Sequence, residues 1–159
     1  MSTPIFADIE ASMNDASGFP TAICWSLANG EIKSVLIIPE DEWLEDEENI
    51  EPHVNMRELY NHGVPVLDII REMNEDLDGK TVYMPGHYFE NEWLEKLFAA
   101  YNIDPSFEPL PLAELLNIDQ EDVPGQINQI KLDYALDSPH ESESNVLAML
   151  YIAREMGLI

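Results

Sequence analysis

The fold is decided by the stretch PIFADIEAS (residues 4–12), which has the apolar composition of a buried strand and yet contains two carboxylates. Side chains alternate between the two faces of a strand, so Asp8 and Glu10 point the same way. Two like charges buried side by side are costly unless they are paired, and no lysine or arginine is near them in the sequence. Hard divalent cations such as Mg²⁺ or Mn²⁺ are the usual partners of such a pair. The stretch therefore predicts a metal site on a central strand.

The charge of the 159-residue chain is strongly acidic, with 32 Asp and Glu against 7 Lys and Arg and a formal net charge of −25. The basic residues are scattered and form no patch in the sequence, and an acidic surface repels phosphate backbones. This argues against tight, general binding of nucleic acid. Three explanations of the charge stay open: a solvating surface, a salt-adapted source, and a surface that binds a protein partner.

Length and composition predict one domain over residues 1–159, since 45% hydrophobic residues are enough for a core. No apolar run reaches the length of a membrane-spanning helix, and the first residues have no features of a signal peptide. The one cysteine, Cys24, lies in an apolar run and is expected to be a core residue. These features favour a cytoplasmic protein without membrane contact.

Strand patterns come first and helical patterns follow. We expect strands at residues 5–11, 21–27 and 32–38, and Asn29-Gly30 between the last two predicts a β-hairpin. Ser138 and Glu141 predict a capping box at the start of the last helix. Trp43, in an acidic segment at residues 39–48, is expected to pack over the edge of the core. An antiparallel meander followed by strands alternating with helices predicts a mixed sheet covered by helices. Further strands are expected at 80–84 and near residue 107, with helices at 56–61, 65–77, 89–101, 112–116, 123–136 and 139–156.

Two later segments contain residue types that would extend the metal site. Residues 83–94 read as a strand, a turn and a helix, with Glu90 in the first helical turn. Residues 139–150 place His140 at a helix entrance and Asn145 five residues further on. A weaker third segment begins at His53.

With these segments the chain resembles the DEDDh family of 3′–5′ exonucleases, which includes ribonuclease T, oligoribonuclease and polymerase proofreading subunits. Asp8 and Glu10 match the aspartate and glutamate of its first motif. Glu90 stands where the second motif has an aspartate, and His140 and Asn145 stand where the third has a histidine and an aspartate. The likeness spans nearly the whole chain. It implies an α/β fold of the ribonuclease H-like class: a five-stranded mixed sheet, antiparallel through strands one to three and then parallel, with helices on both faces.

The resemblance also implies the chemistry of a hydrolase. In the family, four carboxylates hold two divalent ions roughly 4 Å apart at the scissile phosphate, and the histidine is the general base. By resemblance, Asp8 would bridge two Mg²⁺ or Mn²⁺ ions, Glu10 would complete one of them, and His140 would take the proton from water.

Two positions depart from the family pattern. Glu90 keeps the charge with one more methylene, whereas Asn145 offers an amide oxygen without negative charge. Loss of a carboxylate should weaken ion binding. The site could therefore hold one ion, or none, instead of two. Glu141, one helical turn before Asn145, could supply the missing ligand.

The first expectation is therefore an exonuclease-like protein with a weak or inactive site. Its substrate, if it is active, is short single-stranded DNA or RNA, because no basic track would hold a long strand. The alternatives are a non-catalytic acidic module that binds a protein or mimics nucleic acid, and an active exonuclease from a saline habitat.

For single residues, ordinary structural roles compete with the functional ones. Asp8 and Glu10 could face solvent on an edge strand, His140 could belong to a capping turn, and Asn145 could be a satisfied buried amide. The other histidines are interpreted as loop residues rather than ligands: His53, His62 and His87.

Overall fold

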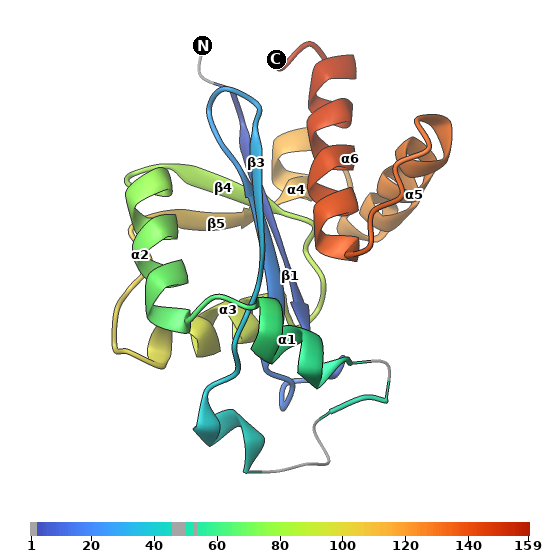
Figure 1. The fold of residues 1–159 in the computed structure, drawn as a ribbon. Helices are drawn as coiled ribbons and strands as arrows, with labels where there is room; N and C mark the ends of the chain where they lie inside the picture. Colours follow the sequence, from blue (N-terminus) through green and yellow to red (C-terminus); the bar gives the residue numbers. More distant parts are fainter. Residues whose placement is uncertain (1–2, 46–49, 53) are drawn as a thin grey trace.

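The computed structural model of the chain describes residues 3–45, 50–52 and 54–159, and its centre is a five-stranded sheet (Figure 1). The strand order is β3-β2-β1-β4-β5. Antiparallel pairing joins β1 to β2 and β2 to β3, whereas β4 runs parallel to both β1 and β5. The predicted fold class is confirmed by this mixed topology. The strands are β1 (Ile5–Ala11), β2 (Pro20–Ser26), β3 (Ile32–Leu36), β4 (Thr81–Met84) and β5 (Glu108–Pro111).

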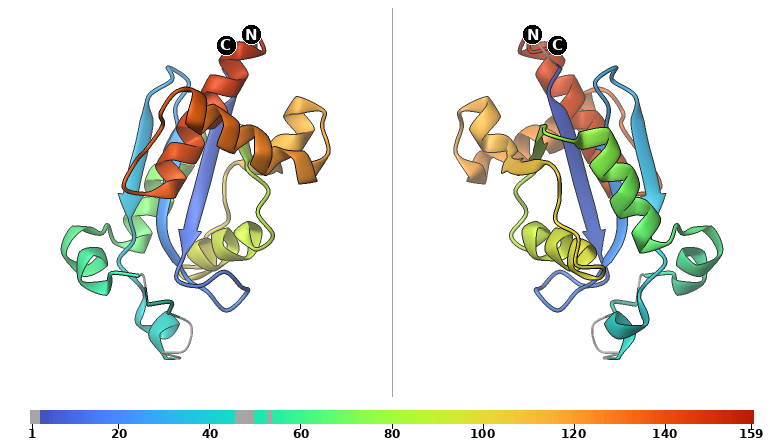
Figure 2. Two further views of the ribbon diagram at one scale, coloured as in Figure 1. Left: turned by 90° about the vertical axis from the view of Figure 1, so that its right-hand side faces the viewer. Right: turned by 90° about the vertical axis from the view of Figure 1, so that its left-hand side faces the viewer.

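Alternating side chains of β1 bury two separate cores, one on each face of the sheet. Ile5 and Ile9 face a core built with α2 and α3, and Phe6 faces a second core built with α4, α5 and α6. Figure 2 shows α5 and α6 in front of the sheet in one view and α2 in front of it in the other. Asp8 and Glu10 share the face of Phe6, so they point toward α6. The helices are α1 (Met56–His62), α2 (Val66–Leu77), α3 (Glu90–Ala99), α4 (Leu112–Leu116), α5 (Val123–Asp133) and α6 (Glu141–Glu155), with short 3₁₀ turns η1 (Asp41–Leu44) and η3 (Gln120–Asp122).

The β2–β3 connection is the hairpin that Asn29-Gly30 predicts. Gly30 has a φ of +86°, in the left-handed region that favours glycine. The N–H of Leu27 donates to the carbonyl of Glu31 at 2.8 Å and closes the turn. Strand β3 is shorter than predicted and ends at Leu36, and the next residue, Ile37, still donates its N–H to the carbonyl of Thr21 at 2.9 Å and also bridges to Val64.

The pairing of β1 is unequal on its two sides. Its ladder with β2 extends to Ala11, but its ladder with β4 consists of the pairs Ile5↔Val82 and Phe6↔Tyr83. Asp8 and Glu10 therefore lie past the last residue that pairs with β4. This opening between two central strands positions the candidate site.

The start of α6 differs from the prediction. The helix begins at Glu141 with His140 as its N-cap, and the side chain of His140 makes no capping hydrogen bond. The predicted capping box is wrong, since Ser138 lies two residues before the N-cap. The helix uses a different cap, which belongs to the candidate site.

The expectations for Trp43 and Cys24 are met. Trp43 in η1 is 9% exposed and stacks on Phe19 with ring centroids 5.9 Å apart. Cys24 is fully buried and is a free thiol. None of the described helices combines the length and the apolar character needed to cross a membrane. The assignment of residues 1–159 to one domain stays a prediction.

Candidate functional site

Asp8 is buried in the middle of β1, with 2% of its surface exposed. Its Oδ2 accepts a 2.7 Å hydrogen bond from Nδ2 of Asn145 on α6, and its Oδ1 accepts one from the backbone N–H of Ile9 at 2.9 Å. Burial raises the pKa of Asp8 well above its ordinary value; the Asn145 hydrogen bond opposes this effect and the charge of Glu90 adds to it. Burial therefore favours the protonated, neutral form of the Asp8 carboxyl group.

Glu10 serves as the N-terminal cap of α6. Its Oε2 accepts hydrogen bonds from the hydroxyl of Ser142 at 2.6 Å and from the backbone N–H of Ser142 at 3.2 Å. The first N–H groups of a helix have no partner within the helix, and a carboxylate there also suits the helix dipole. Glu10 therefore caps the N-terminus of α6, although it is 132 residues away in the sequence. The predicted capping box would have supplied this cap from residues next to the helix.

Glu90 is the first residue of α3, and it is 3% exposed. Both of its carboxylate oxygens lie 3.0 Å from the backbone nitrogen of Gly86, and Oε1 also accepts from the N–H of His87 at 2.8 Å. Burial raises the pKa of Glu90 to about 7, and the backbone N–H groups act against that rise. Gly86 has a φ of +91°, in the left-handed region that favours glycine, so the turn that holds this carboxylate selects glycine.

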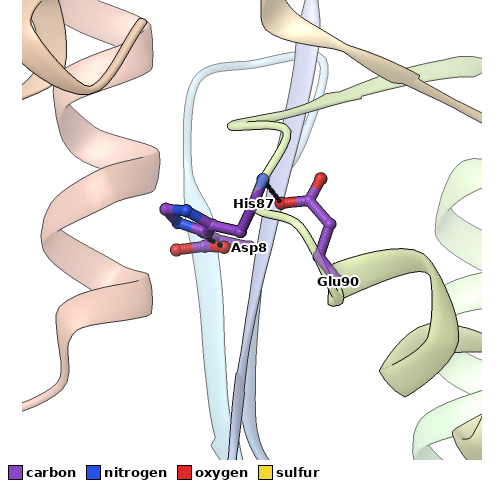
Figure 3. A group of neighbouring side chains, drawn as sticks. All are labelled: Asp8, His87 and Glu90. Atoms are coloured by element: carbon purple, nitrogen blue, oxygen red, sulfur yellow. Dashed lines mark hydrogen bonds and ion pairs between the residues drawn. The ribbon is translucent and has the colours of Figure 1, made fainter. Parts of the chain in front are cut away.

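His87 joins the two buried carboxylates. Its Nε2 lies 3.9 Å from Oδ1 of Asp8, and Figure 3 shows its ring against that carboxylate while its backbone N–H meets Glu90. One donor atom from each of Asp8, His87 and Glu90 lies within 4.8 Å of the others. Burial lowers the pKa of His87, and the charge of Glu141 has the opposite effect. We refer to these three residues as the Asp8–His87–Glu90 cluster.

The sequence analysis interpreted His87 as a loop residue, and it does lie in the loop between β4 and α3, but the proximity to Asp8 was not predicted. The available signal was its position in the turn directly after a predicted strand, three residues before Glu90. Loops at strand ends often carry functional side chains, which is the argument that would have selected it.

Two cavities adjoin the cluster. The first, of about 400 Å³, is lined by Asp8, Glu10, Glu141 and Asn145 among others. The second, of about 420 Å³, is lined by residues that include Glu90 and Gly86. His87 and Tyr88 line both cavities, so they form the wall between them.

His140 lies at the entrance of α6, as its N-cap, and its side chain approaches α1. Its Nε2 lies 3.4 Å from Oε1 of Glu58 on α1, and its side chain is 29% exposed. His140 lines neither cavity, although the next residue, Glu141, lines the first one. The role of His140 as general base thus stays a prediction. His53 lies outside the described residues.

Comparisons with known proteins support the fold. No protein-family model and no curated protein matches the sequence. Among 11 matching chains of solved structures is one from a crystal structure of SSB/Exonuclease I in complex with the inhibitor CFAM. The TM-score is 0.68 at 12% sequence identity, and the match covers 97% of this chain and 41% of that one. The chain therefore has a ribonuclease H-like exonuclease fold and spans less than half the length of that neighbour.

Proposed function

We propose that this chain is a divergent DEDDh-type nuclease, a weak divalent-metal-dependent 3′–5′ exonuclease for short single-stranded DNA or RNA. The observation that carries the proposal is the convergence of Asp8, Glu10 and Glu141 on one cavity, where β1 leaves β4, in a fold shared with an exonuclease. Glu90 adjoins Asp8 from the other side of His87. Weak activity is expected from the two departures at Glu90 and Asn145.

The donor set around Asp8, drawn from both cavities, fits a hard divalent cation because it consists mainly of carboxylates. Asp8 and Glu90 would hold the ion, with Glu10, Glu141 and the amide of Asn145 as further candidate ligands. The chemistry that such an ion supplies is activation of a water molecule and neutralisation of charge at the phosphate.

The hydrogen bonds of the site explain why activity would be low. Asn145 donates an N–H to Asp8 where the family has a carboxylate that binds metal, and Ser142 donates twice to Glu10. Full recruitment of these oxygens to metal would break bonds that stabilise α6 against β1. His140 would also have to leave Glu58 before it could accept a proton from water at the phosphate.

Incubation of a short, 5′-labelled single-stranded oligonucleotide with Mn²⁺ or Mg²⁺ tests this proposal. We expect slow shortening from the 3′ end, which stops on addition of a chelator and in Asp8→Asn. The matched control is Glu92→Gln, an exposed position in the first turn of α3, which should leave the rate unchanged.

Asn145→Asp tests why the site is weak. Restoring a carboxylate should raise the rate severalfold at saturating Mn²⁺, because a negative ligand replaces an N–H donor. If Asn145→Asp works no faster than the wild type, the weakened-site explanation is wrong. If neither protein shortens the oligonucleotide, the nuclease proposal fails and a non-catalytic acidic module becomes the better account of the net charge of −25.

A further inference from the structure

We propose that the Asp8–His87–Glu90 cluster binds a single first-row transition-metal ion and that the His87 imidazole is one of its ligands. The inference deepens the proposed function and rests on the same carboxylates. The family resemblance implies a site with two ions, whereas this inference gives one ion. It also adds His87 as a ligand, and His87 takes no part in the family resemblance.

The donor atoms fit one ion in type and spacing. Metal–ligand distances of about 2.0–2.2 Å place the atoms around one ion within about 4.4 Å of one another. The three donors already lie within 4.8 Å, and the His87 side chain is 41% exposed, so a small rotation of its ring completes the set. One imidazole nitrogen with two carboxylates favours ions such as Mn²⁺ or Zn²⁺ over Mg²⁺, which prefers oxygen ligands.

The charge balance also fits one divalent ion. Asp8 and Glu90 are 2% and 3% exposed, and within the described ranges no lysine or arginine forms an ion pair with either. His87 is the basic side chain that approaches Asp8. Two buried carboxylates without a counter-charge are costly, and a single divalent cation would balance both.

A second ion on the Asn145 side of Asp8 would have to compete with hydrogen-bond donors for the carboxylate oxygens of Asp8 and Glu10. Oδ2 of Asp8 faces the Nδ2 group of Asn145 at 2.7 Å. Oε2 of Glu10 accepts both the hydroxyl and the N–H of Ser142. On the side of His87, Oδ1 of Asp8 accepts the N–H of Ile9, and the oxygens of Glu90 accept the N–H groups of Gly86 and His87. An imidazole nitrogen also faces Oδ1 at 3.9 Å, and a carboxylate oxygen can take a second partner. An ion on this side would leave the bonds that Asn145 and Ser142 make intact.

The position of His87 gives an ion access without opening the core. The residue lies between the two cavities, and it is followed by Tyr88, which is 87% exposed. An ion from solvent can reach the imidazole first and then the two carboxylates.

Electron paramagnetic resonance with Mn²⁺ tests the inference on the chelator-treated full chain. High salt and excess Mg²⁺ suppress loose binding to the acidic surface. We expect one tightly bound Mn²⁺ per chain, with hyperfine coupling to a ligand nitrogen. His87→Ala should remove the nitrogen coupling and weaken Mn²⁺ binding at least about tenfold. The matched control, His62→Ala, should retain both the coupling and the affinity, because His62 is exposed at the end of α1 and lines neither cavity.

Two results would overturn the inference: two tight ions per chain, or nitrogen coupling and affinity that survive in His87→Ala. The proposed function is tested separately by the oligonucleotide assay. One ion that depends on His87, with no nuclease activity, would reject the nuclease and retain this site. Nuclease activity with two ions, and no effect of His87→Ala, would support the nuclease and reject the single-ion site at His87.

Discussion

Helices α3 and α6 reach the site in opposite ways, although each begins near a histidine and a glutamate. At α3, Glu90 turns back on the loop that precedes it, and His87 faces the buried Asp8. At α6, the capping carboxylate is Glu10 from a distant strand, and His140 faces Glu58 near the surface. In each case the histidine side chain faces a carboxylate, which is Asp8 for His87 and Glu58 for His140. The two histidines therefore have different partners, although each precedes a helix.

The largest predicted effect is on the pH dependence of the unfolding free energy, and it arises from Glu90 at the start of α3. The start of α6 has no group with such a contribution in this prediction. The pKa of Glu90 is raised from 4.5 to about 7 by burial, so between these pH values the folded state holds a proton that the unfolded state has lost. Unfolding free energy should therefore fall as the pH rises through this window, by about 3 kcal/mol for this group.

Urea unfolding in a chelator, at steps across that pH range, measures this loss of stability. Glu90→Gln should flatten the profile, leaving the contribution of Asp8, whose pKa is also raised. Glu92→Gln, at an exposed position of the same helix, should keep the wild-type slope. Equal slopes in all three proteins would mean that Glu90 ionises normally in the folded chain.

Asn145→Ala should have the next largest effect, because it removes the N–H donor from buried Asp8. Removing the hydrogen-bond partner of a buried polar group costs about 2 kcal/mol. Urea unfolding without metal, at a pH above 7, should show this loss, whereas Asn91→Ala at an exposed position should change little. A change no larger than that of the control would show that Asp8 finds another partner.

Ser142→Ala tests the distant cap of α6. Loss of the hydroxyl bond to Glu10 should reduce stability by about 1 kcal/mol, with the backbone N–H bond retained. The paired variant Ser138→Ala should stay within about 0.5 kcal/mol of the wild type, since Ser138 lies outside the helix. A larger loss of stability in Ser138→Ala than in Ser142→Ala, by thermal or urea unfolding, would show that Ser138 caps the helix as first predicted.

Glu58→Gln should have the smallest effect. The Glu58–His140 pair is partly exposed, and such pairs contribute less than about 0.5 kcal/mol. Differential scanning calorimetry near pH 6 would measure the change. A loss above 1 kcal/mol would show that the pair fixes the start of α6, and His140 would then be a structural residue.

Local patterns were sufficient to predict most of the fold. Asn29-Gly30 identifies the hairpin because the turn depends on two adjacent residues, and α4 begins and ends at Leu112 and Leu116 as expected. Helix ends were less accurate: α3 ends at Ala99 and α5 at Asp133, each before the predicted last residue. Apolar periodicity identifies a buried face but does not fix the residue at which the hydrogen-bonded ladder stops.

The site was harder to predict because its bonds connect distant parts of the chain. The sequence placed Asp8 and Glu10 on one face of a strand, and both line one cavity. It gave no sign that Ser142 would bind Glu10, since the two residues are 132 positions apart. The choice between His87 and His140 likewise depends on side-chain partners that only the folded chain provides.

The short ladder between β1 and β4 makes one backbone group a reporter of the site. Past the pair Phe6↔Tyr83, the amide hydrogen of Ile9 is held by Oδ1 of Asp8. Amides exchange slowly with deuterium when they are bonded and shielded. Any ligand that draws that carboxylate away would release the Ile9 amide and quicken its exchange, while amides bonded to β2 keep their protection.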